Sequence, residues 1–154
     1  YSWWENIIAG KKRGIDCTVQ LGQELPRIFA VHLSHRSEAI RVESAKQLIS
    51  LAKTQEQPVF VVGDLNSSPA EFSYSAVDTD GNNAIESFSQ SQLFKRKVYA
   101  PSELSSFSYQ AFNRERMLDW VLIPLACHYL SYEIIDCKLS DHLPVFARIT
   151  LPTP

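Results

Sequence analysis

An aspartate and an asparagine follow the most strand-like segment of this chain. Residues 59–62 (Val-Phe-Val-Val) are β-branched or aromatic and predict a buried strand, with Gly63 and Pro69 bracketing its exit. Asp64 and Asn66 stand at i and i+2, so an extended backbone presents both side chains on one face. A carboxylate and an amide at the rim of a sheet suit a metal or phosphate site better than a packed core.

Other polar residues also stand at or within apolar strands. His32 follows residues 28–31, Asp119 lies inside residues 117–123, and Asp141-His142 precedes residues 143–145. A carboxylate in an apolar strand must be paired or bound, and an imidazole is an economical partner. Such a pair would fix the ring tautomer and let the ring take a proton from water. Each residue alone could be a turn former, a cap or a surface group, but their co-occurrence favours a site.

The elements that must position these residues alternate in type. We expect a mixed α/β (α+β) fold in which the late strands pair antiparallel, and in which His32 and Asp64 end neighbouring strands, where ligands bind in open sheets. The predicted elements are an antiparallel hairpin of strands 14–22 and 27–33, a helix capped by Ser37 and running to about Thr54, a strand at 58–63, a short helix near 83–94, and strands at 117–123, 131–138 and 143–151.

Length and charge restrict the class of protein. A chain of 154 residues, 45% hydrophobic and 21% charged, predicts one ordinary globular domain. The formal charge of −2 argues against a dedicated nucleic-acid module. Three basic clusters are interpreted as solvated loops: Lys11-Lys12-Arg13, Lys95-Arg96-Lys97, and Arg114 with Arg116.

Apolar runs and cysteine usage give the sequence's only information about the cellular compartment. No apolar run approaches the ~20 residues of a transmembrane helix, so no transmembrane segment is expected. The three cysteines fit no zinc spacing. Reduced thiols and a cytoplasmic location are favoured, although Cys127 and Cys137 could pair if the chain is secreted.

Three segments together resemble the last signature motifs of the endonuclease/exonuclease/phosphatase superfamily, the deoxyribonuclease I-like group. They are residues 63–69 (Gly-Asp-Leu-Asn-Ser-Ser-Pro), 118–120 (Leu-Asp-Trp) and 139–145 (Leu-Ser-Asp-His-Leu-Pro-Val). Residues 32–36 resemble the histidine motif that precedes them, and the order fits from about residue 14 onward. The resemblance implies a two-layer β-sandwich flanked by helices, four layers in all, with mixed and mostly antiparallel sheets.

The resemblance also implies roles for individual residues. His142 would be the general base, or a hydrogen-bond donor to the transition state, and Asp119 would orient it. Asp64 would position the attacking water or the metal and assist proton transfer to the leaving oxygen. Asn66 and His32 would contact the phosphate. The implied metal is Mg²⁺ (or Mn²⁺), and its implied ligands are Asp141, Asp64 and Asn66.

The family's earlier motifs provide an asparagine and a glutamate that is the main metal ligand. Only Glu5 is a candidate here, and it lacks a preceding apolar strand. We therefore interpret residues 1–154 as a single domain, the C-terminal part of the family domain, whose N-terminal half is an absent partner. The chain alone is expected to bind metal weakly and to be inactive until that half is supplied.

The implied function is a Mg²⁺-dependent phosphohydrolase, more specifically a phosphodiesterase of the nuclease or phospholipase-C/sphingomyelinase type. Its substrate would be a phosphate ester: a nucleic acid, a phospholipid or a small phosphoester. Inositol-polyphosphate phosphatases are disfavoured because Ser67-Ser68 and Leu118-Asp119-Trp120 replace their usual motifs. The alternative is a non-catalytic binding or scaffold module of the same fold, against which the Asp119–His142 pair argues.

Further side chains have open roles. His35 and Arg36 could reach phosphate or could simply begin a solvated helix. Arg41 could pair with a carboxylate beneath the site. Phe107, Tyr109 and Phe112 could stack on a base or lipid, or could anchor a loop in the core.

Overall fold

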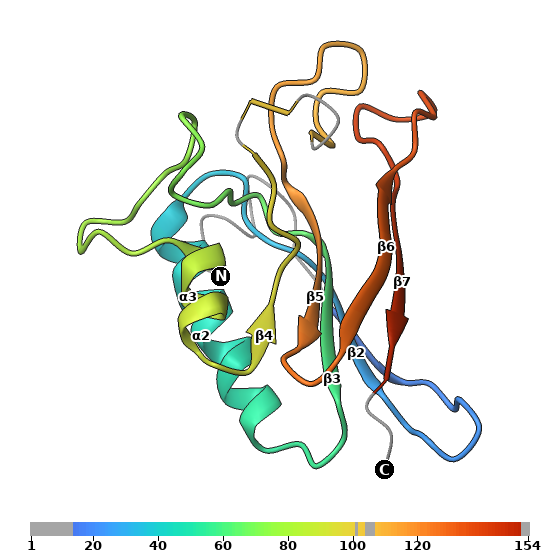
Figure 1. Cartoon of the computed structure of the whole chain (residues 1–154). Coiled ribbons are helices and arrows are strands. Elements are labelled where there is room, and N and C mark those ends of the chain that lie inside the picture. Colours follow the sequence, from blue (N-terminus) through green and yellow to red (C-terminus); the bar gives the residue numbers. More distant parts are fainter. Residues whose placement is uncertain (1–13, 101, 104–106, 152–154) are drawn as a thin grey trace.

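The computed structural model describes residues 14–100, 102–103 and 107–151. Glu5 lies outside the described residues. The described part has a mixed α/β fold, as predicted, and Figure 1 shows its elements. In chain order they are β1 (Ile15–Thr18), β2 (Arg27–His32), α2 (Glu38–Lys53), β3 (Val59–Asp64), α3 (Ala84–Gln90), β4 (Phe94–Lys95), β5 (Asp119–Pro124), β6 (His128–Ile134) and β7 (Val145–Thr150).

The strands form two sheets. The larger has the order β1-β2-β3-β5-β4, and the smaller consists of β6 and β7. β1 and β2 form the predicted antiparallel hairpin, β2 and β3 run parallel across the α2 crossover, and the late strands are all antiparallel to their neighbours. The single parallel pair matters for the site, because it brings the carboxyl ends of β2 and β3 to the same edge.

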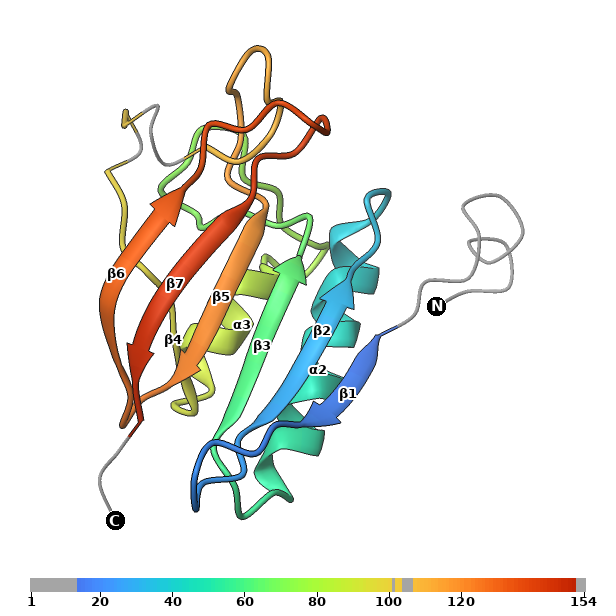
Figure 2. The same cartoon turned by 90° about the vertical axis from the view of Figure 1, so that its right-hand side faces the viewer.

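Helices cover one face of the large sheet, and a hairpin covers the β5 end of the other face (Figure 2). Figure 2 shows α2 and α3 behind the sheet and the β6–β7 hairpin in front of its β5 end. The main core lies on the helix side, and its largest fully buried side chains include Trp120, Phe29 and Phe88. A smaller cluster on the hairpin side contains Phe60 and Ile123. The described residues therefore form three layers: helices, five-stranded sheet and hairpin.

Two tyrosines of β6 join the hairpin to the large sheet. β4 is too short to pair with the whole of β5, and its two residues pair with Ile123 and Pro124. Beyond it, Tyr129 donates its hydroxyl hydrogen to the Val121 carbonyl (2.5 Å), and Tyr132 accepts from the Val121 N–H (3.2 Å). Burial raises the pKa of both tyrosines, so these hydroxyls stay protonated as the donors and acceptors that β5 requires.

Several strand bounds differ from the prediction, each for a local reason. The first strand ends at Thr18 because Leu21 and Glu24 already pair within the turn. β5 begins at Asp119, since the Met117 N–H bonds the Tyr74 hydroxyl and so lies off the ladder. β6 covers residues 128–134 rather than 131–138. β7 begins only after Pro144, which has no N–H to donate.

Helix α2 confirms the predicted helix, and its apolar residues at helical spacing, among them Val42, Ala45 and Ile49, are buried. Ser37 occupies the N-cap position but makes no side-chain cap hydrogen bond, so the predicted capping by its hydroxyl is wrong. All three cysteines are free thiols. Among the described residues, no helix combines the length and apolarity needed to cross a bilayer.

Candidate active site

Strand register aligns three of the predicted site residues across neighbouring strands. His32, the last residue of β2, pairs with Asp64, the last residue of β3. Asp64 in turn pairs with Asp119, the first residue of β5. His32 Nε2 lies 3.3 Å from Asp64 Oδ2. Residues far apart in sequence thus form one row at the edge of the sheet.

The turn after β3 is fixed by two residues with positive φ. Gly63 has φ 126°, and a Cβ there would lie 2.1 Å from the Val31 carbonyl oxygen, so only glycine fits. Asn66 has φ 48°, a left-handed conformation that asparagine tolerates better than most residues. The Asp64 Oδ1 atom accepts the Asn66 N–H at 2.8 Å, closing an Asx-turn. The turn-forming role of Asp64 and its place in the site are therefore compatible.

Asn66 directs both of its amide hydrogens inward. Its Nδ2 lies 2.9 Å from Asp64 Oδ2 and 3.2 Å from the Leu33 carbonyl oxygen. Both partners can only accept, which fixes the orientation of the amide. Asn66 therefore holds Asp64 against the end of β2, and its remaining oxygen suits a cation better than a phosphate oxygen.

His142 reaches this row from the β6–β7 connection. Tyr109 forms a bridge with His142, and the Leu143 N–H donates to the Ser108 carbonyl at 2.7 Å. The Ala111 N–H donates to the Asp141 carbonyl at 2.9 Å. These backbone bonds dock residues 141–143 beside the start of β5. The Tyr109 ring packs on the His142 ring with centroids 4.8 Å apart.

Asp119 and His142 form the predicted pair. His142 Nδ1 lies 2.8 Å from Asp119 Oδ2, and the Ser108 hydroxyl donates to the same oxygen at 2.6 Å. Because the carboxylate accepts from Nδ1, a neutral His142 ring leaves its lone pair on Nε2, which lies 3.9 Å from Asp64 Oδ2. Burial lowers the pKa of His142, but the Asp119 hydrogen bond and the charges of Asp119, Asp64 and Asp141 outweigh it, so the pKa is raised.

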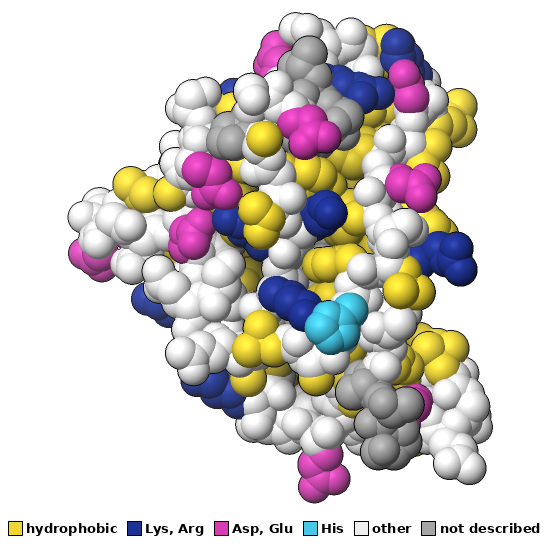
Figure 3. All heavy atoms as spheres, viewed as in Figure 1, with side chains coloured by type: hydrophobic (Ala, Val, Ile, Leu, Met, Phe, Trp, Pro, Cys, Tyr) yellow, Lys and Arg dark blue, Asp and Glu magenta, His cyan; other side chains and the backbone are white. Residues whose placement is uncertain are grey.

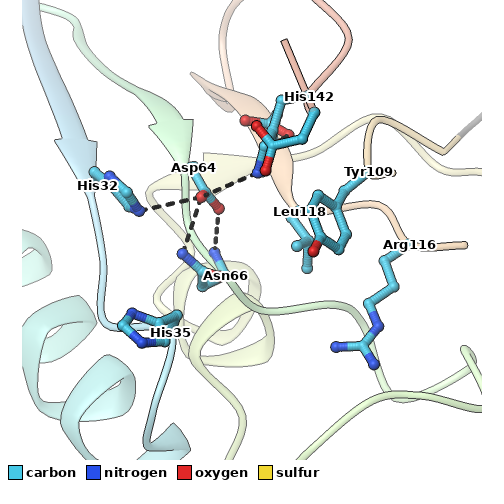
Figure 4. Close-up of a pocket in the computed structure, with 10 residues that line it drawn as sticks. His32, His35, Asp64, Asn66, Tyr109, Arg116, Leu118 and His142 are labelled. Carbon is cyan, nitrogen blue, oxygen red and sulfur yellow. Dashed lines mark hydrogen bonds and ion pairs between the residues drawn. The ribbon is translucent and has the colours of Figure 1, made fainter. Parts of the chain in front are cut away.

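These groups converge on a pocket of about 650 Å³. Figure 4 shows His32, Asp64, Asn66 and His142 around it. The structure thus brings all six predicted site residues to one pocket, together with four others. The lining residues are His32, His35, Asp64, Asn66, Tyr109, Arg116, Leu118, Asp119, Asp141 and His142.

The donor groups at the pocket fit a hard divalent cation. Metal-ligating atoms of Asp64, Asp119 and His142 lie within 4.8 Å of one another. Oδ2 of Asp119 already binds His142 and Ser108, whereas Asp64 and the Asn66 amide oxygen place further oxygen atoms at the same rim. Mg²⁺ commonly uses one or two carboxylates, waters and substrate phosphates, which matches this set. Asp141 lines the pocket but its carboxylate is exposed and does not join the group.

A buried ion pair supports the site from below. Glu38 accepts from the Arg41 Nε at 2.7 Å, and its other oxygen accepts from the Ser67 hydroxyl at 2.8 Å and the Ala84 N–H at 2.7 Å. Arg41 also donates to the Ser34 carbonyl at 2.7 Å. The predicted carboxylate partner of Arg41 is therefore Glu38, and the pair ties the His32 and Asn66 segments together.

The three aromatic residues whose roles the sequence leaves open, as ligand-stacking groups or as loop anchors, differ in position. Phe107 is a core anchor that packs against Phe72 and Tyr74, whereas Tyr109 lines the pocket and Phe112 is exposed. Sequence reasoning missed Ser108, which lies in a serine-rich segment without a distinguishing pattern. It also assigned Arg116 to a solvated loop.

Comparison with known proteins identifies the family. The family model described as the Endonuclease/Exonuclease/phosphatase family matches residues 8–142. The chain belongs to this family. Members of the endonuclease/exonuclease/phosphatase family are hydrolases of phosphoesters and generally depend on a divalent metal. A search of curated protein sequences finds no match.

Solved structures share the fold at low identity. A mannosyl-6-phosphatase of Bacteroides thetaiotaomicron aligns with TM-score 0.63 and 17% identity, over 84% of this chain and 53% of that one. The human nocturnin catalytic domain aligns with TM-score 0.63 and 17% identity, over 90% and 53%. The endonuclease domain of TRAS1, a telomere-specific non-LTR retrotransposon, gives 0.60 and 9%, over 92% and 67%. The chain thus spans about half the length of the first two structures.

Proposed function

We propose that this chain carries the water-activating part of a Mg²⁺-dependent phosphohydrolase, most specifically a phosphodiesterase. One observation carries the proposal: His142 Nδ1 is bound to Asp119 at 2.8 Å while Nε2 faces the pocket that Asp64 lines. An imidazole fixed in this tautomer is arranged to accept a proton from a water in the pocket.

Each of the pocket residues has its own role in the proposed reaction. His142 Nε2 takes the proton of the attacking water, and Asp119 stabilises the imidazolium that results. Asp64 orients the water from the opposite side, and Asn66 keeps the Asp64 carboxylate in place through its amide. His32, whose side chain is 54% exposed, presents a ring nitrogen at the same rim for a phosphate oxygen.

A divalent ion bound at Asp64, with the Asn66 amide oxygen, would supply positive charge where the phosphoryl oxygens become more negative. Asp141 remains a proposed outer ligand, through water. The expectation that a glutamate from the family's earlier motifs is also needed stays a prediction, as does the N-terminal half as partner.

Substrate class is the open part of the proposal. The structural relatives are named as a sugar phosphatase, nocturnin and an endonuclease, so the fold alone favours no substrate. The face shown in Figure 3 carries acidic and basic side chains interspersed, without a broad basic patch. A panel of single-stranded DNA, RNA, sphingomyelin and phosphoinositides would distinguish the classes.

The test compares H142Q with H128Q. His128 is exposed at the start of β6 and does not line the pocket, so H128Q is a matched control. Hydrolysis is measured with and without Mg²⁺, in this chain and in the longest natural form of the protein that contains it. We expect Mg²⁺-dependent turnover that falls by about 10²-fold or more in H142Q and is unchanged in H128Q. Equal turnover in both variants would contradict the assignment of the base.

The scaffold alternative makes a different prediction. A binding module would retain phosphate-ester binding in H142Q and D119N and would show no Mg²⁺-dependent turnover in any form of the protein. Turnover in the longest form but not in this chain would support catalysis and the expectation that the chain alone is incomplete.

A further inference from the structure

Tyr109 lines the pocket, and the proposed reaction gives it no role. Its ring lies against the ring of His142, with the two centroids 4.8 Å apart and the two planes tilted by 46°. Both side chains line the main pocket, and Figure 4 shows the Tyr109 ring beside Leu118, on the side of the pocket opposite His32. The contact therefore involves the group that accepts the proton of water in the proposed function.

The contacts of the His142 ring hold its two nitrogens unequally. Nδ1 is bound to Asp119 at 2.8 Å. Nε2 lies 3.9 Å from Oδ2 of Asp64, which is longer than a hydrogen bond. A ring held at Cβ and at Nδ1 can still rock about the line that joins those two atoms, and this motion swings Nε2 sideways. A side chain packed against the face of the ring limits such a motion.

The backbone of Tyr109 is held at several points. Its N–H donates to the Arg116 carbonyl at 2.9 Å, and its carbonyl accepts the N–H groups of Glu115 at 2.8 Å and Arg116 at 2.6 Å. Tyr109 also forms the bridge to His142 itself. Phe112, in the same loop, differs because its side chain is 74% exposed and does not line the pocket. The Tyr109 ring therefore projects from the fixed base of the loop and can restrain its neighbour.

We propose that Tyr109 is a positioning residue for His142. Its ring blocks the swing of the imidazole on one side and keeps Nε2 directed at the water that Asp64 orients. The preceding residue, Ser108, donates to the Asp119 carboxylate at 2.6 Å, so two adjacent residues hold the two members of the pair. A misplacement of about 1 Å can lower a rate by about 10²-fold. The inference rests on the proposed function, which makes Nε2 the proton acceptor.

Positioning is tested first without turnover. The order of the His142 ring C–H bonds is measured by ¹³C relaxation in metal-free chain, after urea unfolding has shown that each variant is folded. We expect the order parameter to fall from about 0.85, typical of a rigid group, to about 0.6 or below in Y109A. Y109F keeps the ring and F112A removes a different aromatic from the same loop, so both should match the unaltered chain. An unchanged order parameter in Y109A, or an equal fall in F112A, would overturn the proposal.

Kinetics then test the consequence, in the form of the protein that turns over. We expect kcat of Y109A to fall by about tenfold or more with KM little changed, and kcat of Y109F and F112A to be retained. A loss confined to KM would show that Tyr109 contacts substrate instead, and a loss shared by F112A would trace the effect to the loop; either result contradicts positioning.

The two measurements separate this inference from the proposed function. A lower order parameter in Y109A, with no turnover in any form of the unaltered protein, would support the ring contact and contradict the proposed function. Turnover that falls in H142Q but not in Y109A would support the proposed function and contradict the positioning role of Tyr109.

Discussion

Ser108 donates its hydroxyl hydrogen to Oδ2 of Asp119 over 2.6 Å, the same oxygen that binds His142 Nδ1. The Ser108 oxygen in turn accepts the N–H groups of Leu118 and Asp119, each at 3.2 Å. This fully buried serine therefore fixes both the carboxylate and the backbone from which it projects.

Replacing Ser108 by alanine should remove its hydrogen bond to the Asp119 carboxylate and its hydrogen bonds from the Leu118 and Asp119 N–H groups. We expect a loss of about 1–3 kcal/mol in the free energy of unfolding, because two buried N–H groups lose their acceptor. With one donor fewer on Asp119, the pKa of His142 should rise further. Urea unfolding and an NMR titration of the ring measure the two effects. S50A, at an exposed serine of α2, is the control and should change neither quantity.

Asp119→Asn should reverse the pKa shift of His142. Burial alone lowers this pKa, and the Asp119 carboxylate is the main group that raises it. We therefore expect a lower pKa in D119N, measured on the ring signals of metal-free protein, with the His128 ring as internal reference. A His142 pKa that does not move would contradict the pairing.

The same shift predicts how stability depends on pH. Because the folded-state pKa of His142 is raised, the stabilisation from its pair with Asp119 is fully present below the unfolded value of about 6.5 and is lost as pH rises through the folded value. D119N should remove this loss. Unfolding free energies measured across that pH window, in both proteins and without metal, provide the check.

Gly63→Ala should be among the most damaging small substitutions. The new Cβ would meet the Val31 carbonyl oxygen at 2.1 Å in a backbone with φ 126°, so strain and a steric clash combine. We expect a destabilisation of at least about 2 kcal/mol. Gly22→Ala is the matched control, since φ is also positive (64°) but no atom lies within 4 Å. Similar losses in both variants would show that the clash is relieved.

Breaking the Glu38–Arg41 pair should disrupt the support beneath the site. R41M leaves the buried Glu38 carboxylate without its cation, and we expect a loss of about 3–5 kcal/mol. D16N, which breaks the exposed pair with Arg27, should change stability little. If R41M and E38Q each cost much and the double variant costs little more, the two residues act as one unit, as the contacts indicate.

Metal binding should depend on Asp64 more than on Asp141. Asp64 belongs to the cluster of ligand atoms, whereas Asp141 is exposed outside it. Paramagnetic broadening by Mn²⁺ should centre on residues 64–66, disappear in D64N and persist in D141N. Broadening that requires Asp141 as well as Asp64 would restore the full ligand set that the family resemblance implies, and broadening that persists in D64N would contradict this prediction.

The sequence by itself predicted most of the strands, the main helix and the family. Residues 59–62 are apolar and Gly63 follows them, so the strand and its exit could be predicted locally. The extended backbone predicted for residues 64–66 is wrong, because Asn66 has φ 48° and closes an Asx-turn on Asp64. The helix of residues 38–53 follows from its own periodicity. These features are local, because periodicity and turn chemistry act over a few residues.

Tertiary structure decided which polar residues meet. Strand order and register place Asp64 between His32 and Asp119, and backbone pairing of residues 108–111 with 141–143 brings His142 to Asp119. Nothing in the residue types distinguishes Ser108 from the serines around it, or Arg116 from Arg114. Their difference is one of position: Ser108 is buried against a carboxylate, and Arg116 faces a recess while Arg114 is neutralised by Asp136. Long-range packing alone sets those surroundings.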